Sequence, residues 1–251
     1  MSNVKTEAEI EAMRRSGAIL AEVYEVLRPQ LVRGVTAKDI AAMAKSEIES
    51  RGAQAVLLGY QNFPDVICTS FNEQVVHGIP TDRELVDGDL ISLDMCVGYE
   101  GMITDSAFTT VVGGEAQVKA RTRILLQATE QALYHGIEQV RPGARIGDIS
   151  HAIQRRLLRD DLGVIEKLVG HGVGHQVHED PEVPNFGIAG RGPTLKPGMT
   201  IAIEPMATLG GKEVYTEADG WTITSQDRSL SAHFEHTVAV TEDGYEILTR
   251  T

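Results

Sequence analysis

The most constraining feature of the sequence is a pair of aspartates, Asp94 and Asp105, inside two adjacent β-rich runs at residues 90–97 and 103–112. A two-residue turn at Tyr99-Glu100 would join these runs into a hairpin. With that turn, Asp94 lies directly opposite Asp105, and the two Cβ atoms are about 4.5–5.5 Å apart. Strand alternation then puts both carboxylates on one face and the apolar side chains of the first run on the other.

Two like charges that face each other in an otherwise apolar ladder destabilise it unless a cation lies between them. Bridging carboxylates are typical of sites that hold two divalent ions about 3.5–4 Å apart. We therefore take a dinuclear metal site as the working hypothesis. The alternative is that the two aspartates lie near a turn on a solvated face, with no function.

The overall composition limits the class of protein. A chain of 251 residues suits one large domain or two small ones and can bury a substantial core. The formal net charge of -13 argues against nucleic-acid or anionic-membrane partners, which require clustered Lys and Arg. Two cysteines are too few for a disulfide framework, and the sequence has neither a signal-peptide pattern nor a run of 18 apolar residues. We expect a cytoplasmic protein.

Helix signals alternate with β-like runs along the chain. Thr6 and Glu9 form a capping-box pattern, which predicts a helix that ends at Pro29. The spacing of apolar residues predicts further helices over residues 36–51, 119–140 and 146–161, and short β-like runs near residues 54–58 and 65–78.

The two halves of the chain repeat this order. Gly34 is followed five residues later by Asp39, and Gly143 is followed five residues later by Asp148, each aspartate opening a short helix. The sequence therefore predicts one catalytic domain over residues 1–251, with an internal repeat of approximately 5–112 and 115–249. Such a repeat folds as two similar halves about a pseudo-two-fold axis.

The repeat also pairs the acidic residues. Asp94 lies six residues after Gly88, and Glu204 lies six residues after Gly198. Asp105 and Glu235 each begin a β-rich run, with a long excursion, residues 207–232, in the second half only. Strand pairs that meet at the axis would bring the four carboxylates together. Glu204 precedes Pro205, which favours the extended backbone of a strand end.

The segment GHGVGHQVH, residues 170–178, combines glycines with imidazoles that suit a divalent ion or proton transfer. His171 is the candidate metal ligand, and His178 is the candidate for contact with a substrate. His77 occupies a similar turn in the first half. The remaining histidines are interpreted as structural, although two of them flank Glu235 and could contact the ligands from behind; these are His135, His151, His175, His233 and His236.

Taken together, these stretches resemble the methionine aminopeptidases of the short type I form, over nearly the whole chain. The segments that carry the resemblance are residues 62–80, the Asp94 and Asp105 pair, and residues 170–181, 195–205 and 219–249. The resemblance implies an α+β "pita-bread" fold (creatinase/aminopeptidase-like), an antiparallel sheet covered by helices in two pseudo-symmetric halves. It also implies metal-ligand roles for one set of residues: Asp94, Asp105, His171, Glu204 and Glu235.

The reaction implied by the resemblance is removal of the initiator methionine from nascent chains and peptides when the second residue is small. It further implies a methionine pocket whose candidates are Tyr60, Phe63, Cys68 and Trp221, and it favours a monomer. The chain lacks the extension through which we would expect ribosome docking, so at most a transient proximity to the ribosome is expected. Four positions depart from residues common in the family and bear on metal and substrate preference: Gln61, Cys96, Val177 and Ala202.

The hypothesis for the mechanism is metal-assisted hydrolysis. Two divalent ions, bridged by Asp105 and Glu235, would hold a water or hydroxide that attacks the scissile carbonyl, with Glu204 as general base. His178 would steady the carbonyl, and His77 would contact the backbone near the leaving amine. Oxygen and nitrogen ligands without thiolate leave Co, Mn, Fe and Zn open.

Two other functions compete with this hypothesis. A pita-bread hydrolase that cleaves X-Pro bonds would usually carry an extra N-terminal domain. A metal-free relative that only binds peptides would not need the complete ligand set.

Overall fold

The computed structural model describes residues 4–250, so residues 1–3 of the N-terminal segment and Thr251 lie outside the described part. The helices are α1 (Glu7–Leu27), α2 (Ala37–Ser50), α3 (Ala120–Ile137) and α4 (Ile146–Leu158), with 3₁₀ turns η1 (Arg28–Gln30), η2 (Tyr60–Asn62) and η3 (Glu115–Gln117). The strands are β1 (Gln54–Ala55), β2 (Cys68–Phe71), β3 (Gln74–Val76), β4 (Leu90–Tyr99), β5 (Met102–Val111), β6 (Gly163–Val164), β7 (Val169–Gly172), β8 (Glu179–Pro184), β9 (Thr200–Ile203), β10 (Met206–Thr208), β11 (Val214–Thr216), β12 (Ile223–Ser225), β13 (Ser231–His233), β14 (Glu235–Val240) and β15 (Tyr245–Ile247). The helices predicted from the sequence are all present, with ends that differ by a few residues.

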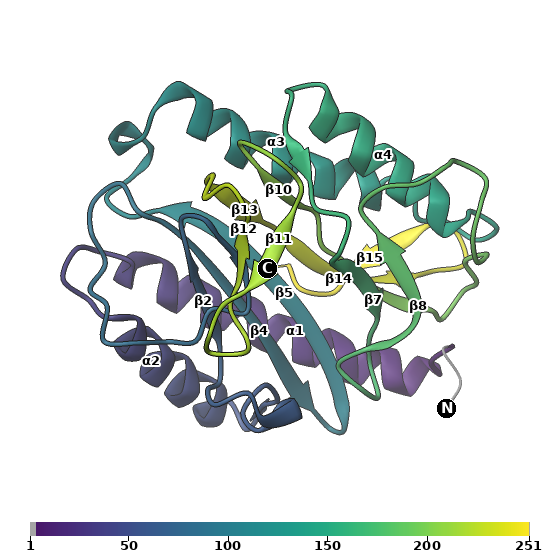
Figure 1. The fold of residues 1–251 in the computed structure, drawn as a ribbon. Coiled ribbons are helices and arrows are strands. Elements are labelled where there is room, and N and C mark those ends of the chain that lie inside the picture. The colour runs from purple at the N-terminus through teal and green to yellow at the C-terminus, as the bar shows by residue number, and fades with distance from the viewer. Residues whose placement is uncertain (1–3, 251) are drawn as a thin grey trace.

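One large antiparallel sheet dominates the described residues. Its nine strands include the path β1-β4-β5-β14-β9-β7-β8, with β2 paired to β4 and β15 paired to β14. Helix α1 packs on β4 and β5, and α3 packs on β9 and β14. Figure 1 shows α1 and α2 on one side of the molecule, and α3 and α4 on the other, around the central strands. This arrangement confirms the expected α+β fold with helices that cover an antiparallel sheet.

The hairpin of β4 and β5 differs from the prediction in its register. Its turn is Glu100-Gly101, not Tyr99-Glu100, because Tyr99 pairs with Met102. Both turn residues have positive φ, 49° and 81°. A type I′ turn requires this geometry, which Gly101 adopts without strain. Asp94 therefore pairs with Ala107, and Asp105 with Cys96, so the two aspartates are not directly opposite each other. They remain on one face as diagonal neighbours, because a shift of two residues preserves the side on which each side chain points.

The excursion in the second half, residues 207–232, contains strands of its own. Strand β10 pairs with β13 and β6, and β12 pairs with β11 and with β3 from the first half. The excursion is thereby fixed against the first half of the chain. It carries Trp221 next to Phe63, with ring centroids 5.2 Å apart in an edge-to-face contact.

Matched backbone contacts recur in the two halves. The Gly34 N–H donates to the Leu85 carbonyl at 3.0 Å, and the Gly143 N–H donates to the Leu195 carbonyl at the same distance. The side chain of Asp39 accepts the Thr36 N–H at the start of α2, as that of Asp148 accepts the Arg145 N–H at the start of α4. We propose on this basis that the chain contains an internal repeat, as the matched spacings in the sequence predict.

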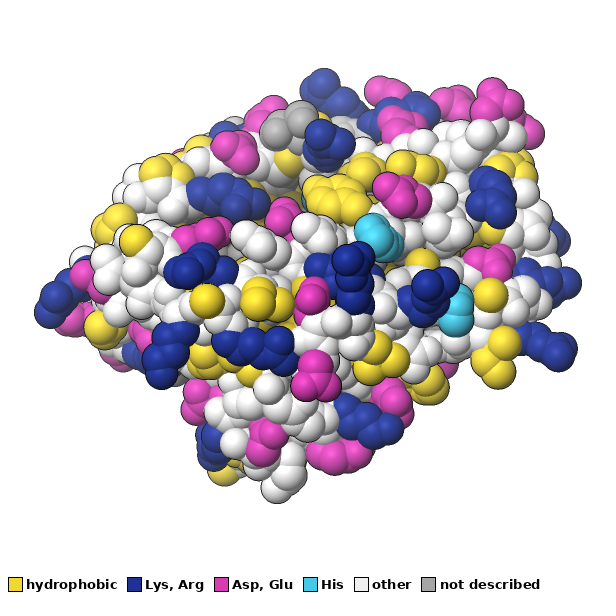
Figure 2. Space-filling view, turned by 90° about the horizontal axis from the view of Figure 1, so that it is seen from above, with side chains coloured by type: hydrophobic (Ala, Val, Ile, Leu, Met, Phe, Trp, Pro, Cys, Tyr) yellow, Lys and Arg dark blue, Asp and Glu magenta, His cyan; other side chains and the backbone are white. Residues whose placement is uncertain are grey.

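The surface carries charges of both signs. Seen from above, over α3 and α4, acidic and basic side chains lie interspersed (Figure 2). None of the helices within residues 4–250 is long and apolar enough to cross a membrane.

Candidate metal centre

Five neighbouring strands of the large sheet supply the predicted ligand residues. Asp94 lies on β4, Asp105 on β5, Glu235 begins β14, and His171 lies on β7. Glu204 follows β9 directly, and its backbone carbonyl accepts a hydrogen bond from the side chain of Asn185 at 3.1 Å. In the order β4-β5-β14-β9-β7, four strands therefore carry one ligand candidate each, and the fifth candidate follows the end of β9.

The register places these side chains on one face. Asp94 pairs with Ala107, which in turn pairs with Glu235, so the three residues form a row across β4, β5 and β14. The methyl group of Ala107 leaves space between the two carboxylates. A second row runs from His171 through Ala202 to Thr237. Alternation puts residues two apart on the same side, so both rows face the same way.

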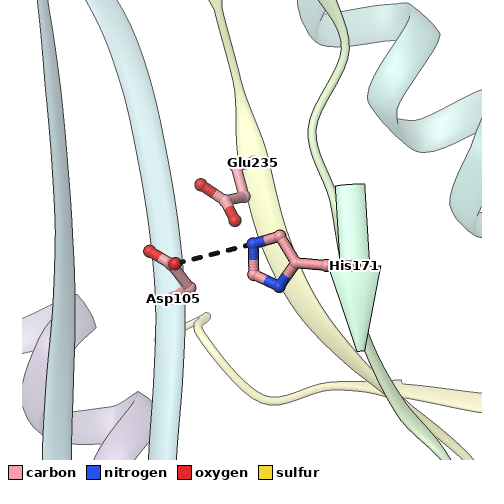
Figure 3. Close-up of side chains that lie close together, drawn as sticks. All are labelled: Asp105, His171 and Glu235. Carbon is pink, nitrogen blue, oxygen red and sulfur yellow. Dashed lines mark ion pairs between the residues drawn. The ribbon is translucent and has the colours of Figure 1, made fainter. Parts of the chain in front are cut away.

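Three of the side chains approach one another closely. One ligand atom from each of Asp105, His171 and Glu235 lies within 4.8 Å of the other two (Figure 3). The Nε2 atom of His171 is 4.0 Å from Asp105 Oδ2 and 3.3 Å from Glu204 Oε1. Its Nδ1–H group donates a hydrogen bond to the Gly172 carbonyl at 2.9 Å, and this tautomer leaves the Nε2 lone pair free for a metal ion.

The electrostatics of this cluster fit divalent cations. Burial raises the pKa of Asp94, Glu204 and Glu235 well above the ordinary values, and the neighbouring Asp105 raises them further. Asp105 Oδ1 and Glu235 Oε1 are buried without a hydrogen-bond partner among the described residues. Buried carboxylates in this arrangement lack compensating positive charge, which bound divalent ions would supply.

A cavity of about 180 Å³ opens onto the carboxylates. It is lined by every candidate named from the sequence for metal, catalysis and substrate: Tyr60, Phe63, Cys68, His77, Asp94, Asp105, His171, His178, Glu204, Trp221 and Glu235. Polar ligand candidates and aromatic side chains thus share one cavity. An arrangement of this kind is suited to a substrate with a polar end and an apolar side chain.

Two histidines line the cavity without being part of the close cluster. The His178 ring lies 4.3 Å from that of His171, and its Nδ1 is 2.7 Å from the Tyr60 hydroxyl. Burial, reinforced by His171, lowers the pKa of His178 to about 4, and burial also lowers the pKa of His77. Both imidazoles are therefore neutral near pH 7 and able to donate or accept a hydrogen bond.

The positions that depart from the family pattern have distinct surroundings. The Cys96 thiol donates to Asp105 Oδ2 at 2.9 Å, and burial raises its pKa, which keeps it a thiol. The Gln61 amide donates to the Tyr60 hydroxyl at 3.1 Å, and Val177 lines the cavity. Ala202 lies between His171 and Thr237 in the second row.

Part of the apolar wall consists of residues that were not predicted from the sequence, namely Leu57, Val76, Leu168, Val169 and Met206. Nothing in the sequence distinguishes these from ordinary core residues. His233 was interpreted as structural, with contact behind the ligands as an alternative, and its Nε2 lies 3.8 Å from both Glu204 Oε2 and Glu235 Oε2. Strand alternation could have singled it out, because it lies two residues before Glu235.

The other histidines have partners away from the cluster. His236 Nδ1 lies 2.9 Å from the Thr249 hydroxyl, and His175 Nε2 lies 2.7 Å from Glu9 Oε1. His151 Nδ1 lies 3.3 Å from the Gly187 carbonyl, and His135 lines a separate surface hollow with His151. These contacts agree with structural roles.

Comparisons with known proteins agree with the geometry. The model of metallopeptidase family M24 matches residues 11–242. A Bacillus subtilis protein named methionine aminopeptidase 1 is 44% identical over 98% of both chains. The crystal structure of methionine aminopeptidase from Thermotoga maritima superimposes with a TM-score of 0.96, at 39% identity over the whole of both chains.

More distant neighbours share the fold alone. The prolidase from Pyrococcus furiosus has a TM-score of 0.78 at 22% identity, and the match covers 99% of this chain but 65% of that one. The high identity and full coverage are found with the aminopeptidases instead. The chain belongs to metallopeptidase family M24, among the methionine aminopeptidases.

Proposed function

We propose that this protein removes the N-terminal methionine from peptides and nascent proteins whose second residue is small, with two divalent metal ions as cofactors. The observation that carries the proposal is the cavity itself, in which buried carboxylates and an imidazole lie beside an aromatic wall. The relatives named methionine aminopeptidase, which match nearly the whole chain, support the same reaction.

The positions of the candidate residues on the sheet support the ligand assignment. Asp105 and Glu235, on the neighbouring strands β5 and β14, are central and would be shared between the two ions. Asp94 would hold one ion from the side of β4. His171 and Glu204, whose Nε2 and Oε1 atoms are 3.3 Å apart, would hold the other. Co, Mn, Fe and Zn all accept such a set of oxygen and nitrogen ligands.

Divalent ions in such a site supply an activated water, whose pKa falls from 15.7 towards about 7, and polarise the scissile carbonyl. Glu204 takes the proton that the water loses. Glu204 lines the cavity beside the other ligand candidates, and this position supports the role of a general base.

The neutral imidazoles position the substrate. His178 donates a hydrogen bond to the scissile carbonyl from Nε2, while its Nδ1 is held by the Tyr60 hydroxyl. His77, which also lines the cavity, contacts the backbone near the leaving amine. Because burial keeps both rings neutral, each ring has one nitrogen that donates a hydrogen bond and one that accepts.

The methionine side chain would lie against the apolar part of the cavity. Phe63 and Trp221 pack edge to face there, and Cys68 and Tyr60 complete the wall. Burial raises the pKa of Cys68, so its thiol stays neutral and suits a thioether neighbour. The polar ligand cluster would then face the α-amine and the scissile bond.

We propose that residues 1–251 form a single catalytic domain and that the protein acts as a monomer. We expect it to act in the cytoplasm on nascent chains, with any contact to the ribosome transient.

The test is release of free methionine from Met-Gly-Met by metal-stripped protein titrated with Mn, Fe, Co or Zn. We expect activity that rises with one or two metal equivalents and disappears when the second residue is bulky. We expect methionine release from Met-Pro-Met but no cleavage of an Ala-Pro dipeptide. Cleavage of the dipeptide would instead indicate a hydrolase specific for X-Pro bonds. Metal binding without methionine release would refute the proposed substrate class. Absence of metal binding would refute the proposed metal site.

A further inference from the structure

We propose that His233 is a positioning residue, which holds the carboxylates of Glu204 and Glu235 from behind and thereby sets the affinity of the metal centre. The inference rests on the proposed metal-dependent function. It concerns a residue that does not line the cavity, so its effect is exerted through the two glutamates.

The backbone of His233 is fixed in place. It ends β13, where its N–H donates to the Thr109 hydroxyl at 2.8 Å, and that hydroxyl donates to the His233 carbonyl at 2.8 Å. It also pairs with Met206 on β10. A side chain on so constrained a backbone can orient its neighbours without large movements of its own.

The ring of His233 lies between two carboxylates. Its Nε2 atom is 3.8 Å from Glu204 Oε2 and 3.8 Å from Glu235 Oε2, and the residue is 1% exposed. Neither ring nitrogen has a hydrogen-bond partner among the described residues. A buried N–H without a partner is costly, and a shift of less than about 1 Å would bring either oxygen within hydrogen-bond reach.

The two oxygens of each glutamate face different ways. Glu204 Oε1 approaches His171, whereas Oε2 approaches His233. Glu235 Oε2 approaches His233, whereas its Oε1 is buried without a partner. An N–H at His233 Nε2 therefore engages the rear oxygen of a glutamate and leaves the front oxygen for a metal ion. Residues that orient metal ligands in this way typically contribute about 10- to 100-fold in metal affinity or activity.

His236 offers a matched control. It also flanks Glu235, but it points to the other side of β14, where its Nδ1 contacts the Thr249 hydroxyl. A general disturbance of the strand would follow from either substitution, whereas the proposed contact involves His233 alone.

The experiment compares wild type, His233→Leu, His233→Gln and His236→Gln as metal-stripped proteins. Mn²⁺ affinity is measured by titration calorimetry, and the coordination of Co²⁺ is followed by its visible absorption. We expect His233→Leu to weaken Mn²⁺ binding about 10- to 100-fold and to shift the Co²⁺ bands. His233→Gln, which retains an N–H donor, should recover most of the affinity, and His236→Gln should bind like wild type.

A second measurement separates positioning from structure. We expect His233→Leu, fully loaded with metal, to lower kcat for Met-Gly-Met with little change in KM, because His233 does not line the cavity. Should His233→Leu fail to fold, as judged by circular dichroism, His233→Met replaces it.

Each contrary result has a defined meaning. Unchanged Mn²⁺ affinity in a folded apolar variant overturns the inference, as does an equal loss in His236→Gln or no recovery in His233→Gln. If wild type itself binds no metal, it is the proposed function that fails instead.

Discussion

The two carboxylate-bearing strand pairs of the molecule have the same role in the sheet but different connections. Strands β4 and β5 are joined by the tight Glu100-Gly101 turn and pair along their whole length. Strands β9 and β14 pair directly as well, yet residues 207–232 separate them in the sequence and form strands of their own. The connection in the second pair also carries a cavity residue, Trp221, which packs against Phe63 from the first half. The two pairs therefore share the placement of their acidic residues, and the second differs by the extra strands that its connection adds.

The largest effect on turnover and metal content should come from substitution of Asp94 and Glu204, the equivalent acidic residues of the two halves. Glu204→Gln removes the proposed base, so we expect kcat for Met-Gly-Met to fall about 10²- to 10⁴-fold with much of the metal retained. Asp94→Asn, in the first half, should instead lower the number of metal ions bound. Steady-state kinetics and metal content of each variant check this, and full turnover by Glu204→Gln at matched metal content would contradict it.

The next largest effect is on the pH dependence of stability, to which carboxylates of both halves contribute. The pKa values of Asp94, Glu204 and Glu235 are raised in the folded stripped protein, so their protonated forms favour folding. Their contribution is complete below the unfolded values of about 4 and is lost as the pH rises through the raised values. We expect the stripped protein to be less stable at pH 8 than at pH 5 on this account.

Metal ions bind the ionised carboxylates and reverse this loss. At a metal concentration of about 100 times Kd, we expect stabilisation of about 2.7 kcal/mol, and less at lower pH, where protons compete. Thermal unfolding at pH 5 and at pH 8, with and without Mn²⁺, measures this stabilisation. A metal-induced shift in Tm that is larger at pH 5 would contradict the assignment of these carboxylates.

Trp221 tests the part of the site that belongs to the excursion. Trp221→Ala removes one wall of the pocket, so we expect a loss of about 1.5–3 kcal/mol in binding the methionine side chain, roughly 10- to 150-fold in kcat/KM. Mn²⁺ affinity should stay at the wild-type value. The exposed Phe186, which does not line this cavity, provides the control variant Phe186→Ala. Equal losses in both variants would refute the pocket assignment.

The smallest effect should come from Cys96 in the first hairpin. Its thiol donates to Asp105 Oδ2, so Cys96→Ala should weaken metal binding by about 1 kcal/mol, roughly fivefold. Cys96→Ser keeps a donor and should restore the affinity. Titration calorimetry with Mn²⁺ distinguishes the variants, and the same affinity for Ala and Ser would show that the thiol does not orient Asp105.

Much of the fold and the site could be predicted because both follow local rules. Caps and apolar spacing predicted the helices, and acids at matched offsets in β-rich runs predicted residues that the sheet then brings to one face. The hairpin register was wrong because the segment 98–101 offers two possible turns. Only the backbone shows that Glu100 and Gly101 take positive φ.

What could not be predicted depends on partners distant in the sequence. The strands of the excursion form because β3 and β6, which lie far away along the chain, provide edges for them. Leu57 and Leu168 line the cavity through the same long-range packing. The difference between His233 and His236 depends on Thr249 and Glu204, neither of which is adjacent to them in the sequence.

The seam between the halves of the large sheet has a consequence for how the molecule holds together. Strand β5 meets β14 at only two residue pairs, Glu235 with Ala107 and His236 with Ser106, whereas ten pairs join β4 to β5. Asp105 and Glu235 lie on opposite sides of this short seam. Ions shared by these two carboxylates would act as a cross-link between the halves. The cofactor would then hold β5 to β14 as well as take part in the reaction, beside the hydrogen bonds that join Asp105 to Thr237 and Ser106 to Glu235.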